Sequence, residues 1–192
     1  MWADRNVGAE SPENYGLYFA WGETQGYEGM TDTKKFYWGD YKFSSGQNAD
    51  DPNFRNSLIK YNTDSTKGSV VDNLTTLLLE DDAAYITDNT CKMPTINDIN
   101  ELVENTTSRW ETLNGVSGRR FTSKKNSNSV FIPASGYYSN GTFLAKNVYC
   151  CLWSSTLQTN PSGVHILNFN SSSVQIYGFD RKNGGSVRPV KK

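Results

Sequence analysis

Three cysteines and a single histidine are the side chains best suited to covalent or acid–base chemistry in this chain: Cys91, the adjacent Cys150 and Cys151, and His165. Neighbouring cysteines rarely bridge, because the ring that they close is strained, so the sequence predicts no disulfide scaffold. The four residues also lack the paired spacing of a zinc site. No serine, cysteine or carboxylate motif stands at a triad-like spacing from His165, so we interpret it as a surface contact. We expect no metal or other cofactor.

The acidic step Glu80–Asp82 is the second group with possible chemistry. It precedes Ala83–Ile86 and is typical of a helix start, because negative charge near the amino end of a helix opposes the helix dipole. A calcium site is the alternative. Calcium needs six to eight oxygen ligands, and no loop here has the spaced Asp-x-Asn-x-Asn-Gly pattern that supplies them. The sequence therefore favours the helix start.

Length and composition limit the class of protein. The chain has 192 residues, of which 36% are hydrophobic and 13% aromatic, and its net charge is −1. These values predict one folded domain over residues 1–192. Lysine and arginine are scattered, so we expect no nucleic-acid partner. No apolar run is long enough to span a bilayer, so we expect no direct membrane insertion, and the first residues lack the order of a signal peptide. Because the chain opens abruptly on a strand-like segment, we expect a leader, a lipid-anchor segment or a further domain upstream.

The elements that must position these side chains are mainly strands. Tyr15–Gly22 alternates aromatic and small residues and predicts an early core strand. From residue 23 to about residue 69, polar turn residues surround isolated aromatics, which predicts an irregular region pinned by rings. These rings are Phe36, Tyr37, Trp38, Tyr41 and Phe54.

One helix and one hairpin stand out further along the chain. Thr95 and Asp98 form a capping pattern before an apolar face, which predicts a helix from about Thr95 to Thr106. Asn114–Gly115 then separates two strand-like segments and predicts a hairpin, and Ser129–Pro133 predicts the next strand. The chain is therefore expected to form an α+β domain.

Alternation along Val164–Phe169 gives a first indication of a binding surface. Leu167 and Phe169 make a natural core pair, which directs Val164, Ile166 and Asn168 outward. An exposed Ile166 near Tyr177 and Phe179 would then form an apolar patch rimmed by polar residues, as binding surfaces often do. The alternative is that these residues complete the core of a twisted sheet.

Several segments together resemble the Fibrobacter succinogenes major paralogous domain family. The segments span the whole chain: Trp2–Ala9, Tyr18–Thr24, Asp81–Ala84, Met93–Thr95, Phe131–Tyr137, Trp153–Ser155 and Gly185–Val190. That family is similar to formylglycine-generating-enzyme-like domains, so the resemblance implies a C-type-lectin-like fold of that type with long irregular loops. The chain departs from the pattern at Cys91–Lys92, where Trp-Arg is expected, and at Leu152, where a tyrosine usually precedes Trp153.

The same resemblance also implies an alternative function, that of an oxidase of the formylglycine-generating type. Formylglycine-generating enzymes use redox cysteines with copper, which Cys150–Cys151 superficially match. Those cysteines are not adjacent in the enzymes, and no supporting acid or metal ligand stands near the pair here. Because a shared fold does not carry function with it, we expect this chain not to be an enzyme.

A second resemblance is to the variable proteins of diversity-generating retroelements, which carry this fold and end in a similar Ser-Val-Arg-Pro-Val segment. The retroelement rewrites adenines, mostly in Asn codons, and so yields Ser, Gly, His, Ile, Tyr, Phe, Asp, Cys, Leu or Val but never Gln, Glu, Lys, Met or Trp. Residues of the permitted set, together with Tyr138, are the expected ligand-binding positions: Tyr138, Tyr149, Cys150, Cys151, Leu152, Ser162, Gly163, His165, Ile166, Tyr177, Gly178, Phe179 and Asp180.

These resemblances imply a binding module at a bacterial cell surface or on a phage tail, whose partner is a protein or a glycan. Its expected scaffold is Trp21, Trp38, the Thr95 helix, Trp153 and an end strand Val187–Val190. An oligomer or a larger assembly would strengthen weak single sites. The alternative is a fixed-specificity adhesin or glycan-binding domain, because aromatic rings beside Asn amides also hold sugars. The calcium-dependent Glu-Pro-Asn and Gln-Pro-Asp sugar motifs are absent.

Overall fold

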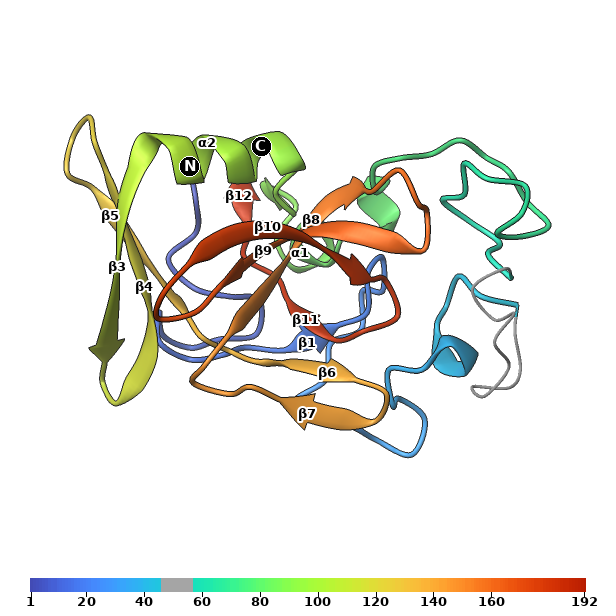
Figure 1. The fold of residues 1–192 in the computed structure, drawn as a ribbon, viewed down its shortest axis with the longest axis horizontal. Coiled ribbons are helices and arrows are strands. Elements are labelled where there is room, and N and C mark those ends of the chain that lie inside the picture. The colour runs from blue at the N-terminus through green and yellow to red at the C-terminus, as the bar shows by residue number, and fades with distance from the viewer. Residues whose placement is uncertain (46–56) are drawn as a thin grey trace.

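Strand formers and turn signals recur along most of the chain, and the computed structural model, which describes residues 1–45 and 57–192, is accordingly rich in β-structure (Figure 1). Strands in several small sheets and two short helices make up a mixed α+β domain in these ranges, as the sequence predicted. Phe54, one of the expected pinning rings, lies outside the described residues.

The central sheet has five strands in the order β1-β11-β8-β9-β10. Neighbours are antiparallel except for β11 and β8, which run parallel. The strands are β1 (Tyr18–Phe19), β11 (Gly185–Ser186), β8 (Cys150–Leu157), β9 (Gly163–Phe169) and β10 (Val174–Asp180). The sheet thus joins the beginning of the chain to its end.

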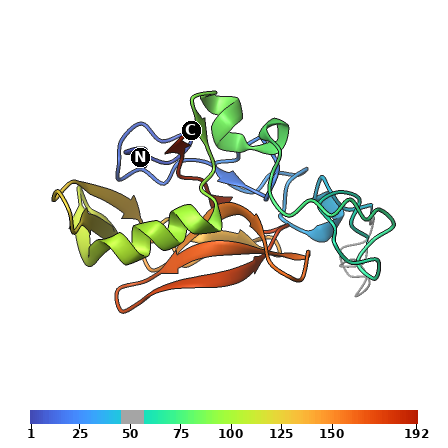
Figure 2. The ribbon, with the colours of Figure 1, turned by 90° about the horizontal axis from the view of Figure 1, so that it is seen from above.

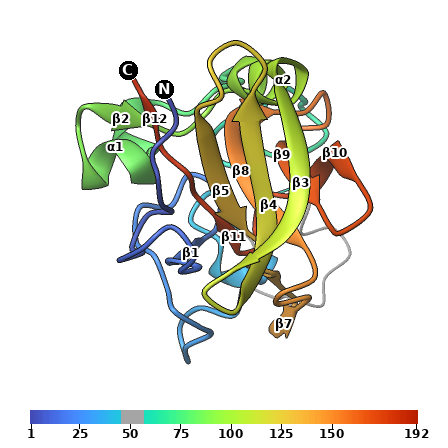
Figure 3. The same ribbon diagram turned by 90° about the vertical axis from the view of Figure 1, so that its left-hand side faces the viewer.

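The second sheet has the order β3-β4-β5; it stands at the left of the central sheet in Figure 1 and faces the viewer in Figure 3. Its strands are β3 (Thr106–Leu113), β4 (Val116–Ser123) and β5 (Ser129–Pro133). Asn114 and Gly115 connect β3 to β4 with φ values of 49° and 84°, the left-handed pair that a two-residue hairpin turn requires. The predicted hairpin and the predicted strand Ser129–Pro133 are both confirmed.

Smaller pairings complete the β-structure. The hairpin of β6 (Tyr137–Ser139) and β7 (Thr142–Leu144) lies beneath the central sheet in the view of Figure 1, and β2 (Cys91–Lys92) pairs with β12 (Val190–Lys191). The prediction of an end strand over Val187–Val190 is wrong, because β11 ends at Ser186 and, of these four residues, only Val190 belongs to β12. The carbonyls of Val187 and Pro189 instead accept bonds from the amino-terminal segment, at Val7 and Ala3.

The two helices begin at the predicted residues. α2 (Ile96–Asn105) is capped by Thr95, whose hydroxyl accepts from the Asp98 amide while the Asp98 carboxylate accepts from the Thr95 amide. α1 (Ala83–Thr87) is capped by Asp82, which accepts from the amides of Ala84 and Tyr85. Each cap satisfies amides that have no partner inside the first helical turn. No helix within residues 1–45 and 57–192 is long and apolar enough to cross a membrane.

Two hydrophobic clusters cover opposite faces of the central sheet. One contains Trp21 and Trp153, both fully buried, and their indoles donate to the carbonyls of Ser154 and Phe19, each at 2.8 Å. The other lies under α2, which crosses the sheet as Figure 2 shows. Since both faces are covered, successive side chains along a central strand point alternately into one core and into the other, instead of into core and solvent.

The irregular region after β1 is held by buried polar contacts as well as by rings. Arg181 is fully buried, donates to the Tyr61 carbonyl and the Tyr41 hydroxyl, and lies 5.0 Å from the Trp21 ring. This arginine connects the loop region to the end of β10, and no local sequence pattern indicates this contact. The predicted irregular region pinned by aromatics is confirmed for its described residues, which include the buried Trp38 in a 3-10 turn, Trp38–Asp40.

Candidate functional site

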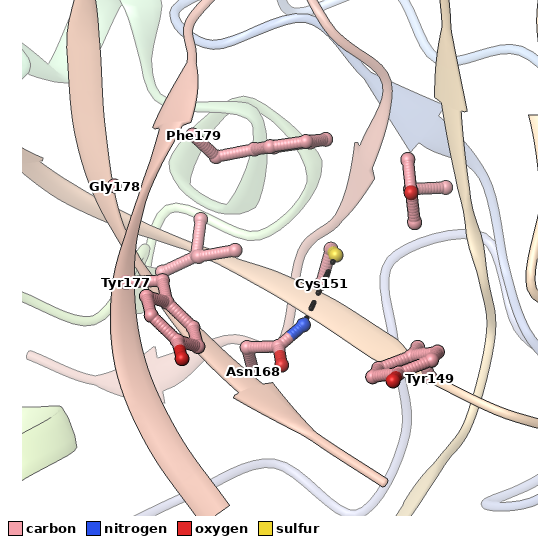
Figure 4. A pocket seen from close by; sticks show the side chains of 8 residues that line it. Tyr149, Cys151, Asn168, Tyr177, Gly178 and Phe179 are labelled. Carbon is pink, nitrogen blue, oxygen red and sulfur yellow. Dashed lines mark hydrogen bonds between the residues drawn. The ribbon is translucent and has the colours of Figure 1, made fainter.

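A pocket of about 210 Å³ opens on one face of the central sheet, next to the β6–β7 hairpin. It draws residues from β6, from the residue before β8, and from β8, β9 and β10, and most of them are labelled in Figure 4. The lining residues are Tyr137, Tyr149, Cys151, Ile166, Asn168, Tyr177, Gly178 and Phe179.

Strand register brings these side chains to the same face. Cys151 on β8 is paired with Asn168 on β9, and Ile166 on β9 is paired with Tyr177 on β10. Residues directly opposite each other in neighbouring strands project to the same side, and so do residues two apart along one strand. Phe179 therefore shares this face with Tyr177.

The pocket has a buried floor and an exposed rim. Cys151 and Ile166 are buried, whereas Tyr149 and Tyr177 are 37% and 50% exposed. The Phe179 ring packs between two other rings. Its centroid lies 5.3 Å from that of Tyr137, with an interplanar angle of 88°, and 5.3 Å from that of Trp153, with an angle of 40°. The rigid aromatic packing beneath supports two tyrosines that are free to meet a ligand.

Asn168 provides the polar anchor of the pocket. Its amide nitrogen donates to the Cys150 carbonyl at 3.0 Å and lies 3.5 Å from Cys151 Sγ, the contact drawn in Figure 4. Both bonds use the nitrogen, so within the described chain the amide oxygen has no partner. An oriented acceptor of this kind is suited to a hydroxyl or amide donor on a ligand.

The electrostatics favour binding of a neutral group. None of the described residues that line the pocket is charged. Burial raises the pKa of Cys151 to about 12, against the lowering effect of the Asn168 amide, so this thiol is protonated near neutral pH. Burial also raises the pKa of Cys150 far above its ordinary range. Because the thiolate is the reactive form, neither cysteine is prepared for nucleophilic or redox chemistry at neutral pH.

Six of the predicted positions line this pocket: Tyr149, Cys151, Ile166, Tyr177, Gly178 and Phe179. The expectation that Val164 and Ile166 point to solvent is wrong, because they are 0% and 2% exposed. Their face of β9 is covered by the Trp21–Trp153 cluster. Asn168, on the same face, is half-buried, as a residue at the pocket must be. The alternative of a twisted-sheet core is thus correct for Val164 and half-correct for Ile166.

The remaining predicted positions do not line the pocket. Cys150 and Leu152 project from the opposite face of β8 into the cluster under α2, where both are fully buried. Ser162 and Gly163 are buried at the start of β9. The expectation that these four residues are displayed is therefore wrong, since each is enclosed by packing.

The prediction that Tyr138 binds the ligand at the surface is also wrong. It is 6% exposed and stacks between Phe36 and Phe143, with ring centroids 5.2 and 4.6 Å away. Alternation on β6 places Tyr137, rather than Tyr138, at the pocket. His165 and Asp180 are half-buried and lie outside the pocket lining; burial lowers the pKa of His165, so its imidazole is neutral near pH 7.

Two pocket residues, Tyr137 and Asn168, were absent from the predicted set. Alternation along β9 carried a signal for Asn168, because it shares a face with Ile166. Tyr137 had no such signal, since its orientation depends on the hairpin with β7 and on the ring of Phe179.

The parts of the chain that the structure describes contain no cluster of metal-ligating side chains. No group of three or more His, Cys, Asp or Glu side chains there is arranged to hold an ion. Asp81, one member of the acidic step, is buried and binds Lys42, Lys60 and the Tyr61 hydroxyl at 2.6–2.7 Å. Its oxygens are occupied by structural partners.

Comparison with models of protein families, with curated proteins and with solved structures finds no match to this chain.

Proposed function

We propose that this chain is a ligand-binding domain that uses the pocket between β6, β8, β9 and β10 to recognise a protein or glycan at a cell surface. The observation that carries the proposal is the convergence of six predicted positions, from three strands and one loop end, on one neutral pocket with two exposed tyrosines. A concave apolar site with a small number of polar groups is the usual form of a binding site.

The resemblance noted in the sequence extends this proposal. We assign the chain to the Fibrobacter succinogenes major paralogous domain family, with a C-type-lectin-like fold of the formylglycine-generating-enzyme type. Its function is then that of a variable protein of a diversity-generating retroelement, displayed on a bacterial surface or a phage tail. The α+β architecture and the codon class of the six pocket residues support this assignment.

The size of the pocket limits what enters it. About 210 Å³ is smaller than the roughly 300–1,000 Å³ of ordinary small-molecule sites. The pocket accordingly receives one neutral side chain or one sugar ring of a larger partner, and the surrounding surface makes the remaining contacts. Tyrosines suit this role because they offer large contact area with little loss of rotamer freedom.

Burial limits which positions tolerate variation. The rim residues Tyr149 and Tyr177 tolerate most substitutions, whereas the floor residue Ile166 tolerates only side chains of similar volume. At Gly178 an added side chain would meet the amide end of Gln158, which is flexible and can move away. The proposed variable surface is therefore smaller than the permitted codons alone suggest.

A fixed-specificity adhesin or glycan-binding domain is the second candidate. The ordered Asn168 amide beside Tyr149 and Tyr177 favours it, since rings beside amides hold sugars. Sequencing of the flanking DNA separates the two: a reverse transcriptase gene and a near-repeat differing only at adenines support the retroelement function, and their absence contradicts it. An oxidase is disfavoured, because Cys150 and Cys151 face opposite clusters and both thiols are protonated.

The binding proposal is tested by screening the chain on glycan and protein arrays and measuring the affinity of each hit. The double substitution Tyr149→Ala and Tyr177→Ala should weaken binding at least about tenfold, because both exposed rings at the rim are lost. Tyr85→Ala is the matched control, since Tyr85 is a half-exposed tyrosine on α1, outside the pocket. Hits whose affinity is unchanged by the double substitution would show that the pocket is not the binding site.

A further inference from the structure

Strand β10 ends the central sheet, and its outer edge is unpaired within the described chain. All seven of its residues, Val174–Asp180, are in register with β9 without a bulge. In Figure 3 β10 lies at the outer side of the molecule, away from β11. A long and regular edge of this kind is a template for another strand.

The hydrogen-bond pattern shows which backbone groups face outward. Ser173 and Asn170 are bonded at one end of the ladder, and Arg181 and Ser162 at the other. Bonded and non-bonded pairs alternate in an antiparallel ladder, so the odd-numbered residues of β10 bond to β9. The amides and carbonyls of Val174, Ile176 and Gly178 therefore point away from the sheet, and none of the residues described here bonds to them.

The edge also lacks the usual protection against pairing. No charged residue, proline or bulge occurs from Val174 to Phe179. β3, one of the two edge strands of the second sheet, differs in this respect, because it carries Arg109 and Glu111 and the Arg109 side chain is 79% exposed. Charged side chains on an edge oppose pairing with another chain.

We propose that a second copy of this chain pairs with β10, antiparallel, across a two-fold axis at Ile176. Ile176 then pairs with its own copy, and Val174 of each chain pairs with Gly178 of the other. All three are residues whose backbone groups face outward, so each of these pairs is a hydrogen-bonded one. An isologous contact of this kind closes after two copies.

Side-chain placement agrees with this register. Directly paired residues share a face, so Tyr177 of one copy lies beside Gln175 of the other on the pocket face. The two Asp180 side chains lie at opposite ends of the paired strands, so like charges do not meet at the centre. The result is a continuous ten-strand sheet with both pockets open on one face, where two weak sites act together on one partner.

The association is measured by sedimentation of the unliganded chain from about 1 to 500 μM, which separates it from any failure of ligand binding. The wild type should shift from monomer to dimer over this range, because a contact made mainly by one strand pair is small and weak. Gln175→Lys should weaken dimerisation at least about tenfold. Thr112→Lys on β3 is the matched control, since Thr112 is exposed on an edge strand of the second sheet, and it should leave dimerisation unchanged.

Hydrogen exchange provides a test that needs no variant. The amides of Ile176 and Gly178 should exchange more slowly as protein concentration rises, whereas those of Gln175 and Tyr177, already bonded to β9, should not change. A chain that stays monomeric throughout, or a dimer whose Ile176 and Gly178 amides exchange at an unchanged rate, would overturn the proposal. Protection of this edge only when an array-selected ligand is added would identify the ligand as the occupant and would equally overturn it.

Discussion

Alanine substitution at Leu152, Ile166 and Tyr177 should give three different losses of stability, which follow from where each side chain lies. Leu152 is fully buried under α2, so truncation leaves an enclosed cavity and should cost about 3–4 kcal/mol. Ile166 is 2% exposed but lines the pocket, where solvent can fill the space, so its loss should cost about 2–3 kcal/mol. Tyr177 is half exposed, and its truncation should cost about 1 kcal/mol or less.

The assay is thermal and urea unfolding followed by circular dichroism. A chain of this length loses about 2–4 °C in Tm per kcal/mol, so Leu152→Ala should lower Tm by about 6–16 °C and Tyr177→Ala by no more than about 4 °C. The urea m-values of the variants should stay equal, because the surface exposed on unfolding is nearly the same. If Tyr177→Ala destabilises the chain as much as Leu152→Ala, the rim is part of the core and the division into floor and rim is wrong.

Three further predictions concern the scaffold. Trp153→Ala should cost about 3–5 kcal/mol in urea unfolding, because it removes a buried ring and the indole bond to Phe19, and a cost below about 1 kcal/mol would contradict its role. Thr95→Ala should cost about 1 kcal/mol and Thr95→Ser much less, and equal losses would argue against the cap. Asp81→Asn should cost about 1–3 kcal/mol at pH 7, a range that allows for the solvent exposure of Lys42. Although burial alone raises the pKa of Asp81, its Lys42, Lys60 and Tyr61 partners hold that pKa below the ordinary 3.8. The stabilisation is therefore present above the unfolded pKa and lost as pH falls through the lower folded pKa, so the unfolding curves of Asp81→Asn and wild type should begin to converge at about pH 4 and coincide only below the folded pKa.

Local signals in the sequence were enough to predict the helix starts and the hairpin. Thr95 with Asp98, and Asn114 with Gly115, act within four residues of each other, and their geometry does not depend on the rest of the fold. The residues that make such interactions are close together in the sequence, so the sequence alone can identify them.

Contacts between distant residues were not predictable in the same way. Arg181 satisfies its guanidinium with carbonyls about 120 residues earlier in the chain, at Lys60 and Tyr61, and no spacing rule indicates such a partner. The prediction that Ile166 is exposed was wrong for a related reason. Alternation correctly separates Ile166 from Leu167, but it cannot say that a second cluster, assembled from the loop region and β1, covers the face of β9 on which Ile166 lies.

The difference between floor and rim also bears on the proposed variable function, because that function requires a domain that stays stable while its surface changes. Cys151 and Ile166 complete the Trp21–Trp153 cluster, and changes there alter the free energy of unfolding as well as the shape of the pocket. Tyr149 and Tyr177 rest on that floor with much of their surface in solvent, so changes there alter recognition with little effect on folding. Substitutions at the rim consequently change the free energy of unfolding little, and selection for new ligands should act first on these two tyrosines.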